Sequence, residues 1–190
     1  MFNFVCTDEE IALVKSNDNQ GNYAEDDGEY VSVTNEDIDR VEKKFNIVFP
    51  AVLRKYYLEH NAKWIKGVEI QEPGADVVYI HEMIPIINTP LNKWGHKNGY
   101  SVECIKEEEM NEIEEFGQLR VRNNFIPLAI NEGGDNYYWD SNDGKVYISY
   151  NADEDENGFE IPYYVCSSVE EMFRLMDEAY DKKIKDDRIM

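Results

Sequence analysis

The sequence predicts an α+β fold in which helices flank a mostly antiparallel sheet. Its β-branched and aromatic segments are short and are separated by turn residues, a pattern typical of strands joined as hairpins. Helical segments lie before and after these strands and do not alternate with them, which disfavours parallel βαβ units. With 190 residues, the chain is long enough for one hydrophobic core and a short extension.

A short helix and an acidic linker are expected at residues 1–29. Thr7 and Glu10 form a capping-box pattern ahead of a small apolar face. Residues 17–29 consist almost entirely of Asn, Asp, Glu, Gln and Gly, which is typical of a solvated segment. We therefore expect the main domain to occupy residues 30–190.

Two helices are expected to open that domain. Thr34, followed by Asp37, favours an N-cap, and apolar residues then recur at spacings of three and four. An apolar elbow ends at Phe49, and Pro50 suits the first turn of a second helix because its missing N–H costs no hydrogen bond there. The second helix is expected to extend to His60 and, like the first, to pack against the core.

Strands are predicted at residues 77–80 and 83–87, followed by a helix over 102–116 capped by Ser101. Glutamates dominate the expected outer face of this helix, where the only cation is Lys106. The glutamates of this face are Glu103, Glu107, Glu108, Glu109, Glu112, Glu114 and Glu115. Like charges at helical spacing destabilise an isolated helix. The face is therefore either simply solvated or a partner-binding surface.

The C-terminal third is expected to form a meander of strands and a final helix. The strands are predicted at 125–130, 136–139, 146–150 and 159–165. Gly133 and Gly134 suit one turn and Gly144 ends another, because glycine tolerates positive φ. Ser167 or Ser168 is expected to cap the last helix.

Charge restricts the class of partner. Asp and Glu number 40 against 19 Lys and Arg, which gives a formal net charge of −21. Such a field repels phosphate backbones and anionic lipid headgroups, so direct binding of nucleic acid or membranes is disfavoured. The composition favours a basic protein partner, and the 13% aromatic content favours a folded chain over a disordered one.

Common sequence motifs of catalysis and cofactor binding are missing. The sequence lacks a Walker loop, a Gly-x-Ser-x-Gly elbow and any His-x-x-x-His pair. The segment Asp140–Gly144 has acidic residues before a glycine, but that glycine falls at position 5 where a calcium loop needs it at 6. We therefore expect no catalytic residues, no metal and no cofactor, and an enzyme that uses a divalent metal is the least favoured interpretation.

The sequence also favours a cytoplasmic protein. No apolar run approaches the ~20 residues that span a bilayer, and the N-terminus has no signal-peptide pattern. The three cysteines, Cys6, Cys104 and Cys166, are far apart and odd in number, which argues against a disulfide framework and a zinc site. We expect them to act as small buried hydrophobic residues.

Two sequence blocks carry a resemblance to a known family. The first covers residues 34–61 and includes Phe49, Pro50, Tyr57 and Asn61. The second covers residues 126–147 and includes Pro127, Gly133, Gly134, Asp135, Tyr138, Asp140 and Gly144. In residue type, spacing and order, these blocks resemble the SUKH superfamily of Smi/Knr-like proteins. The similarity covers roughly residues 30–178.

This resemblance implies an α+β SUKH-like domain that binds partners and does not catalyse a reaction. Bacterial members of the superfamily are immunity proteins that neutralise a polymorphic toxin, often a nuclease, and fungal members are regulatory interaction hubs. We therefore predict an immunity protein for a cognate toxin, and the alternative is a regulatory scaffold of the Smi/Knr type.

Three groups of residues are candidates for binding a partner. The acidic helix contributes Glu107, Glu108, Glu112 and Glu115, the acidic loop contributes Asp153, Glu154, Asp155 and Glu156, and two tryptophans, Trp64 and Trp94, lie in loop-like contexts. Either tryptophan is an exposed anchor or is partly buried. The aromatic residues Tyr137, Tyr138 and Trp139 are further candidates, although one face of their strand must belong to the core.

Overall fold

In the described residues, the computed structural model contains one antiparallel sheet. Six strands, within the described residues, follow one another in the order β1-β2-β3-β4-β5-β6. Their bounds are Val68–Gln71, Val77–Met83, Phe125–Asn131, Asn136–Asp140, Val146–Glu154 and Glu160–Cys166. The residues that the structure describes are 2–17, 32–61, 63, 65–71, 77–87, 101–116, 121–131 and 133–187.

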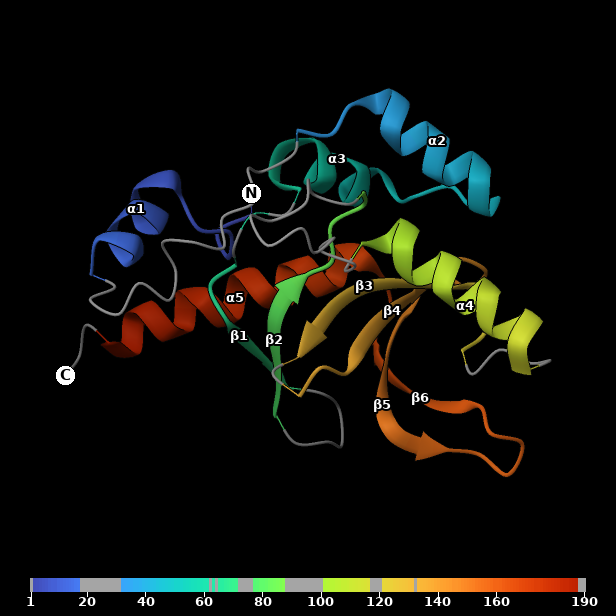
Figure 1. Ribbon diagram of the computed structural model, residues 1–190. Helices are drawn as coiled ribbons and strands as arrows, with labels where there is room; N and C mark the ends of the chain where they lie inside the picture. The colour runs from blue at the N-terminus through green and yellow to red at the C-terminus, as the bar shows by residue number, and fades with distance from the viewer. Residues whose placement is uncertain are drawn as a thin grey trace.

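Helices flank this sheet, as Figure 1 shows, and the predicted α+β class is confirmed. They are α1 (Asp8–Asn17), α2 (Asn35–Phe45), α3 (Ala51–His60), α4 (Val102–Phe116) and α5 (Val169–Asp187). Helix α5 crosses behind the sheet, and α3 packs against α5. Helix α4 lies beside β3. The far ends of β5 and β6 project away from the helices as a free hairpin.

Helix starts follow the predicted capping chemistry. The Thr34 side chain accepts a hydrogen bond from the Asp37 N–H, and the Asp37 carboxylate accepts one from the Thr34 N–H, which completes a capping box for α2. Ser101 Oγ accepts from the Cys104 N–H at the start of α4 (3.1 Å). For α5 it is Ser168 that accepts from the Glu171 N–H (3.1 Å), which settles the choice between two serines.

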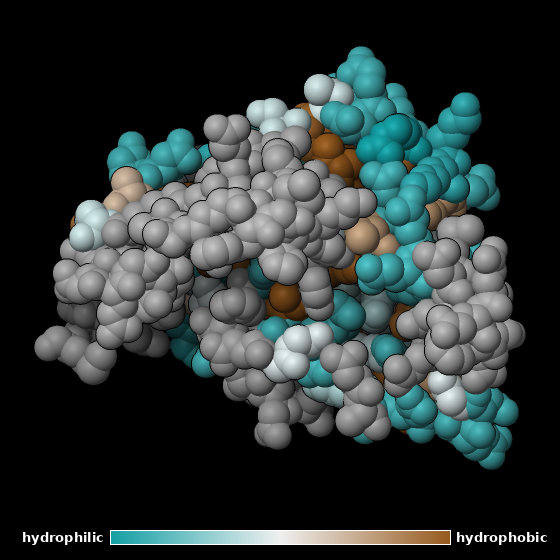
Figure 2. Space-filling model, in the orientation of Figure 1, coloured by the Kyte–Doolittle hydropathy of each residue, from teal (hydrophilic) through white to brown (hydrophobic). Residues whose placement is uncertain are grey.

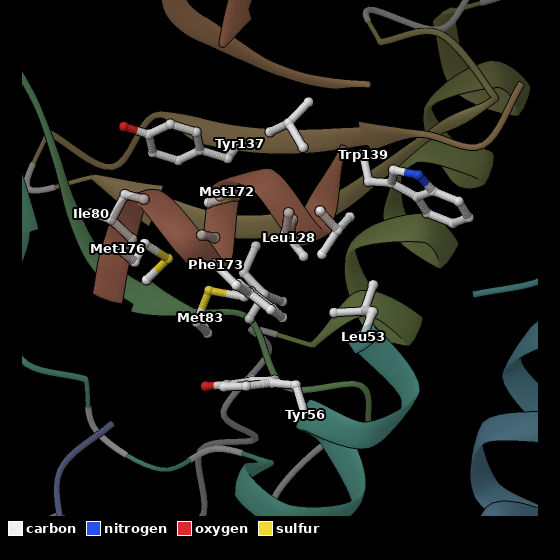
Figure 3. Close-up of a cluster of buried hydrophobic side chains, with 14 of the residues drawn as sticks. Leu53, Tyr56, Ile80, Met83, Leu128, Tyr137, Trp139, Met172, Phe173 and Met176 are labelled. Carbon is white, nitrogen blue, oxygen red and sulfur yellow. The ribbon is translucent and has the colours of Figure 1, made fainter. Parts of the chain in front are cut away.

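The core lies between the sheet and helices α3 and α5. Figure 3 shows Met172, Phe173 and Met176 of α5 pointing at side chains of the strands, with Tyr56 of α3 close by. Each of these four side chains is at most 3% exposed. Their spacing of three and four residues in α5 turns one stripe of that helix toward the sheet.

A second, smaller cluster lies on another part of the sheet. Phe125 of β3 stacks on Tyr147 of β5, with ring centroids 5.3 Å apart, and Tyr138 of β4 lies 5.7 Å from Phe125. Val121 completes the cluster. Because apolar residues gather on both faces, β4 is buried on both sides.

Two features of the sheet differ from expectation. Strand β1 was not predicted, although Val68 and Ile70 are buried and Glu69 between them is exposed. The segment predicted as a strand over 83–87 contributes only Met83 to β2. The Ile84 N–H still donates to the Leu128 carbonyl of β3 (2.9 Å), but from Pro85 onward the backbone bonds to other elements: the Pro85 carbonyl accepts from the Val102 N–H (2.9 Å), and the Ile86 N–H donates to Asn61 Oδ1 (2.9 Å).

The N-terminal segment packs into the same core. Phe4 is fully buried, its ring lies 5.5 Å from that of Phe173 in α5, and its N–H donates to Asp177 Oδ1 (3.2 Å). Val5 forms a β-bridge with Ile65. The expected domain boundary between residues 29 and 30 lies outside the described residues.

Candidate partner-binding surface

The first predicted acidic surface, on α4, is partly neutralised by its neighbour α2. Glu103 accepts hydrogen bonds from Arg40 and from Lys44 (3.0 Å), and Lys44 also pairs with Glu107. Burial raises the pKa of the Glu103 carboxyl, but the hydrogen bonds from Arg40 and Lys44 outweigh it, so the net shift is downward. In Figure 2, hydrophilic side chains cover the region of α2 and α4.

Two charged residues expected on the outer face of α4 are instead buried. Lys106 is 2% exposed and Glu109 is 7% exposed, and they form an ion pair with each other. Lys106 Nζ also donates to the carbonyl oxygens of Asn123 (3.3 Å) and Phe125 (3.1 Å). The expected outward position of this pair is therefore wrong, because Lys106 connects α4 to the backbone at the start of β3 and Glu109 lies beside it as the opposite charge.

Some predicted binding residues lie outside what the structure describes. Trp64 and Trp94 are outside the described residues, and so are the side chains of Glu112 and Glu115 in α4. Glu107 and Glu108 are exposed. A binding role for these residues stays a prediction.

The second predicted acidic surface lies at the free end of the β5–β6 hairpin. Asp153 and Glu154 belong to β5 and not to a loop, while Asp155 and Glu156 begin the turn. The Asp155 carboxylate accepts hydrogen bonds from the N–H groups of Phe159 (3.1 Å) and Asn157 (2.8 Å), and these bonds lower its pKa. The turn therefore holds a carboxylate that stays ionised as the pH falls.

Exposed aromatic rings accompany these acids. Phe159, Tyr163 and Tyr164 are 37%, 39% and 47% exposed. The Tyr163 hydroxyl donates to Asp153 (3.0 Å), and the Tyr164 ring lies 6.2 Å from that of Tyr147. Neighbouring strand residues point to opposite faces, so Tyr163 and Tyr164 place one ring on each side of β6. Large exposed rings beside charges are typical of interface anchors.

Sequence reasoning missed these rings as binding residues, although a signal was present. The segment that became β6 contains two consecutive tyrosines after a phenylalanine, at the last strand of a predicted meander. A last strand lies at a sheet edge, where one side has no neighbour to cover it.

The aromatic residues of β4 take no part in any exposed surface. Tyr137, Tyr138 and Trp139 are 0%, 2% and 4% exposed. Trp139 packs on Phe49, with ring centroids 5.9 Å apart. The expectation that one face of this strand is core is confirmed, and its other face is buried as well.

An open cavity adjoins the acidic turn. Its volume is about 480 Å³, and Arg122, Asp155, Phe159, Glu160, Ile161 and Pro162 line it. Five of these six residues come from the hairpin, and Arg122 comes from the segment just before β3. The hairpin thus combines acidic groups, exposed rings and a cavity at one end of the sheet.

Two other kinds of site are absent from the described residues. Among them, no group of three or more His, Cys, Asp or Glu side chains is arranged to hold a metal ion. No helix in the described part of the chain has the length and apolar character to cross a membrane.

Comparison with known proteins decides the family. The model of the SMI1/KNR4 family (SUKH-1) matches residues 32–175, which is most of the chain. The chain belongs to the SMI1/KNR4 family. A search of curated proteins found no match.

The residues that carry the SUKH resemblance support the fold. Asn61 Oδ1 accepts a hydrogen bond from the Ile86 N–H, in the segment that follows β2. Asp140 Oδ1 accepts one from the Asn142 N–H (2.8 Å) in the β4–β5 turn. Gly134 and Gly144 have φ of 82° and 79°, which other residues adopt only with strain. Remaining members of the set are buried or half-buried in the same elements: Phe49, Pro50, Tyr57, Pro127, Asp135 and Tyr138. Gly133 is exposed in the β3–β4 turn.

Hydrogen bonds to a single carboxylate also stabilise the elbow between α2 and α3 of the SUKH domain. Glu42 accepts from the Phe49 N–H (2.7 Å) and from Arg54 (2.7 Å), so one carboxylate joins the two helices at the Phe-Pro step. Arg54 also pairs with Asp39 (2.8 Å). The family motifs therefore stabilise the fold. The acidic and aromatic residues of the β5–β6 hairpin are not part of these motifs.

Proposed function

We propose that this SUKH protein is an immunity protein that binds and neutralises a cognate polymorphic toxin. The observation that carries the proposal is the family match over residues 32–175, because the family typically consists of immunity proteins against such toxins. SUKH proteins are generally non-catalytic, which agrees with recognition as the activity.

The charge of the chain supports a basic partner. A net charge of −21 creates a field that attracts a positively charged protein surface and speeds its approach. Toxins that cleave nucleic acid need a basic cleft for their substrate. An acidic protein that covers such a cleft prevents substrate from entering it, so binding alone is sufficient for neutralisation.

Neutralisation is proposed to occur in the cytoplasm. None of the three cysteines, all of which lie among the described residues, forms a disulfide, which suits a reducing compartment. Cys166 is buried as expected, whereas Cys6 and Cys104 are only partly buried.

The decisive experiment is protection from a toxin. The genes next to the one that encodes this chain are inspected for a polymorphic toxin. The toxin domain is then expressed in cells with and without the SUKH protein. We expect growth to be restored by co-expression and the two proteins to co-purify. Absence of both a neighbouring toxin and protection would contradict the immunity role and favour a regulatory scaffold.

A further inference from the structure

Glu160, one of the residues that line the cavity at the β5–β6 hairpin, has a carboxylate oxygen without a partner among the described residues. Glu160 Oε2 is buried and makes no hydrogen bond within the described part of the chain. A buried carboxylate oxygen without a donor is costly, and such atoms are rare in folded proteins. A donor that enters the cavity would remove that cost if the half-buried Glu160 side chain turns toward it.

The charge of the cavity selects the donor. Asp155 and Glu160 supply two negative charges, and Arg122 supplies one positive charge. Hydrogen bonds from the turn lower the pKa of Asp155, which keeps this carboxylate charged. The lining therefore has a net negative charge, which favours a cationic group.

The apolar part of the cavity lining favours a ligand side chain that is long and has a planar end group. Phe159 is 37% exposed, and Ile161 and Pro162 continue the apolar surface beside it. An arginine side chain has an apolar stem and a planar guanidinium that stacks on aromatic rings and donates two parallel bonds to a carboxylate. Lysine has a compact ammonium and lacks this planar geometry.

Strand pairing is a less suitable mode of recognition at this edge. Pro162 lies in β6, the last strand of the sheet. Proline in an edge strand is one of the means by which sheets resist the addition of another strand. Side-chain insertion into the cavity does not depend on that edge.

We propose that this cavity receives an arginine side chain of the protein partner, with Glu160 accepting from the guanidinium and Phe159 forming the wall on which it stacks. The partner in question is the toxin of the proposed function, on which this inference rests. The arginine is the anchor of the interface, and the surrounding carboxylates Asp153, Glu154 and Glu156 supply a rim that attracts it.

A titration with a short peptide tests the cavity without the toxin. The probe is acetyl-Gly-Arg-Gly-amide, and its control is the same peptide with citrulline, which keeps the shape and loses the charge. Backbone amide signals of the ¹⁵N-labelled full chain are followed by nuclear magnetic resonance. We expect saturable shifts at Phe159, Glu160 and Ile161 with the arginine peptide, with a dissociation constant on the order of millimolar, and none with citrulline.

Matched variants identify the groups responsible. Glu160→Gln keeps the shape of the side chain and should weaken binding about tenfold, since a charged hydrogen bond is lost. Phe159→Ala should weaken it about fivefold or more. Glu69→Gln removes an exposed carboxylate from β1 at the opposite edge of the sheet and should change binding less than about twofold.

Other outcomes overturn the inference. An arginine site would be excluded by any of three results: no saturable shift at the hairpin, equal binding of the citrulline peptide or of the same peptide with lysine in place of arginine, or equal weakening by Glu69→Gln. Protection from the toxin is measured with the same variants. A toxin neutralised equally well by the wild type and by Phe159→Ala would exclude the cavity while the immunity role stands. Failure of the wild type to protect would contradict the immunity role and the toxin as the partner, and the peptide titration would then decide by itself whether the cavity binds arginine.

Discussion

Lys106 illustrates how a single charged residue stabilises a junction between elements. Its ammonium lies beside the Glu109 carboxylate and donates to two backbone carbonyls just before and at the start of β3. A buried charge is tolerated when an opposite charge and hydrogen bonds surround it. Lys106 therefore secures α4 against the sheet and does not contribute to the outer surface.

Replacing this lysine should destabilise the fold. Lys106→Met keeps much of the side-chain volume but leaves the Glu109 charge without its cation, and we expect a loss of about 3–5 kcal/mol in the free energy of unfolding. Urea denaturation measures the loss. The double variant Lys106→Met with Glu109→Leu should recover part of it, because the uncompensated charge is removed. A single variant as stable as the wild type would contradict the structural role.

His60 makes stability depend on pH. Burial lowers the pKa of its imidazole, and Nδ1 is buried without a hydrogen bond among the described residues. The unfolded chain therefore binds the proton more readily than the folded chain. This contribution to stability is present above about pH 6.5 and is lost as the pH falls below it.

A variant that cannot titrate isolates this effect. His60→Phe keeps an aromatic ring beside Phe2 and Tyr56, whose centroids lie 5.3 and 5.8 Å from the imidazole. Thermal unfolding is followed from neutral to mildly acidic pH. We expect a smaller fall in melting temperature for His60→Phe than for the wild type. Parallel curves for the two proteins would show that His60 does not contribute.

At the scale of elements, the segment before α1 contributes to the core although it precedes the family match. Phe4 is fully buried between the rings of Tyr56 and Phe173. Two ion pairs link α1 and the chain after α3: Lys63 with Asp8 (3.0 Å) and Lys66 with Glu10 (2.9 Å). The SUKH domain of this chain is thus closed by residues outside the matched range.

Truncating the buried ring should show this dependence. Phe4→Ala leaves a cavity between α3 and α5, and we expect a loss of about 3–5 kcal/mol in the free energy of unfolding. Leu13→Ala in α1 is the control, since Leu13 is 61% exposed and should lose less than about 0.5 kcal/mol. Chemical denaturation compares the two. Equal losses would mean that Phe4 is not part of the cooperative core.

Capping residues and turn glycines made most elements predictable, and tertiary contacts explain the rest. Thr34, Ser101 and Gly144 act locally, so their roles can be read from neighbouring residues. Lys106 and Glu109 lie four and seven residues after the buried Val102, so helical spacing places all three on one face. Their charge concealed that position, because polar residues are ordinarily assigned to solvent.

The acidic residues of the candidate site could be predicted from the sequence, but its exposed aromatic rings could not, because their exposure depends on tertiary structure. The acids of residues 153–156 are visible in the composition, whereas exposure of Phe159, Tyr163 and Tyr164 depends on β6 being the edge of the sheet. Exposure of a strand is a property of the whole sheet order and not of its own sequence. The short β1 strand was missed because four residues provide too little alternation to identify.

For the whole molecule, charge and anchoring act on different steps of recognition. A net charge of −21 acts at long range and should determine the rate of association. The rings and cavity of the hairpin act at contact and should determine how long the complex lasts. The two contributions are therefore separable by kinetics.

Charge reversal on α4 tests this separation. Changing Glu108, Glu112 and Glu115 to Lys should lower the association rate with the toxin by about tenfold or more and leave the dissociation rate nearly unchanged. Raising the salt concentration past about 0.1 M, where the screening length is ~10 Å, should slow association of the wild type in the same way. Stopped-flow fluorescence measures both. An association rate unaffected by salt and by reversal would show that α4 is only a solvated face.

The hydrogen bond from the Phe4 N–H to Asp177 joins residues 173 positions apart, and this has a consequence for synthesis on the ribosome. The pocket that receives Phe4 is completed by α5, which begins only at residue 169. Until α5 has left the exit tunnel, Phe4 has the contact with Tyr56 of α3 but not the one with Phe173, and the face of the sheet that α5 covers stays open. We therefore expect nascent chains stalled before residue 169 to remain sensitive to protease and to need chaperone protection, and folding to finish only once α5 has left the tunnel.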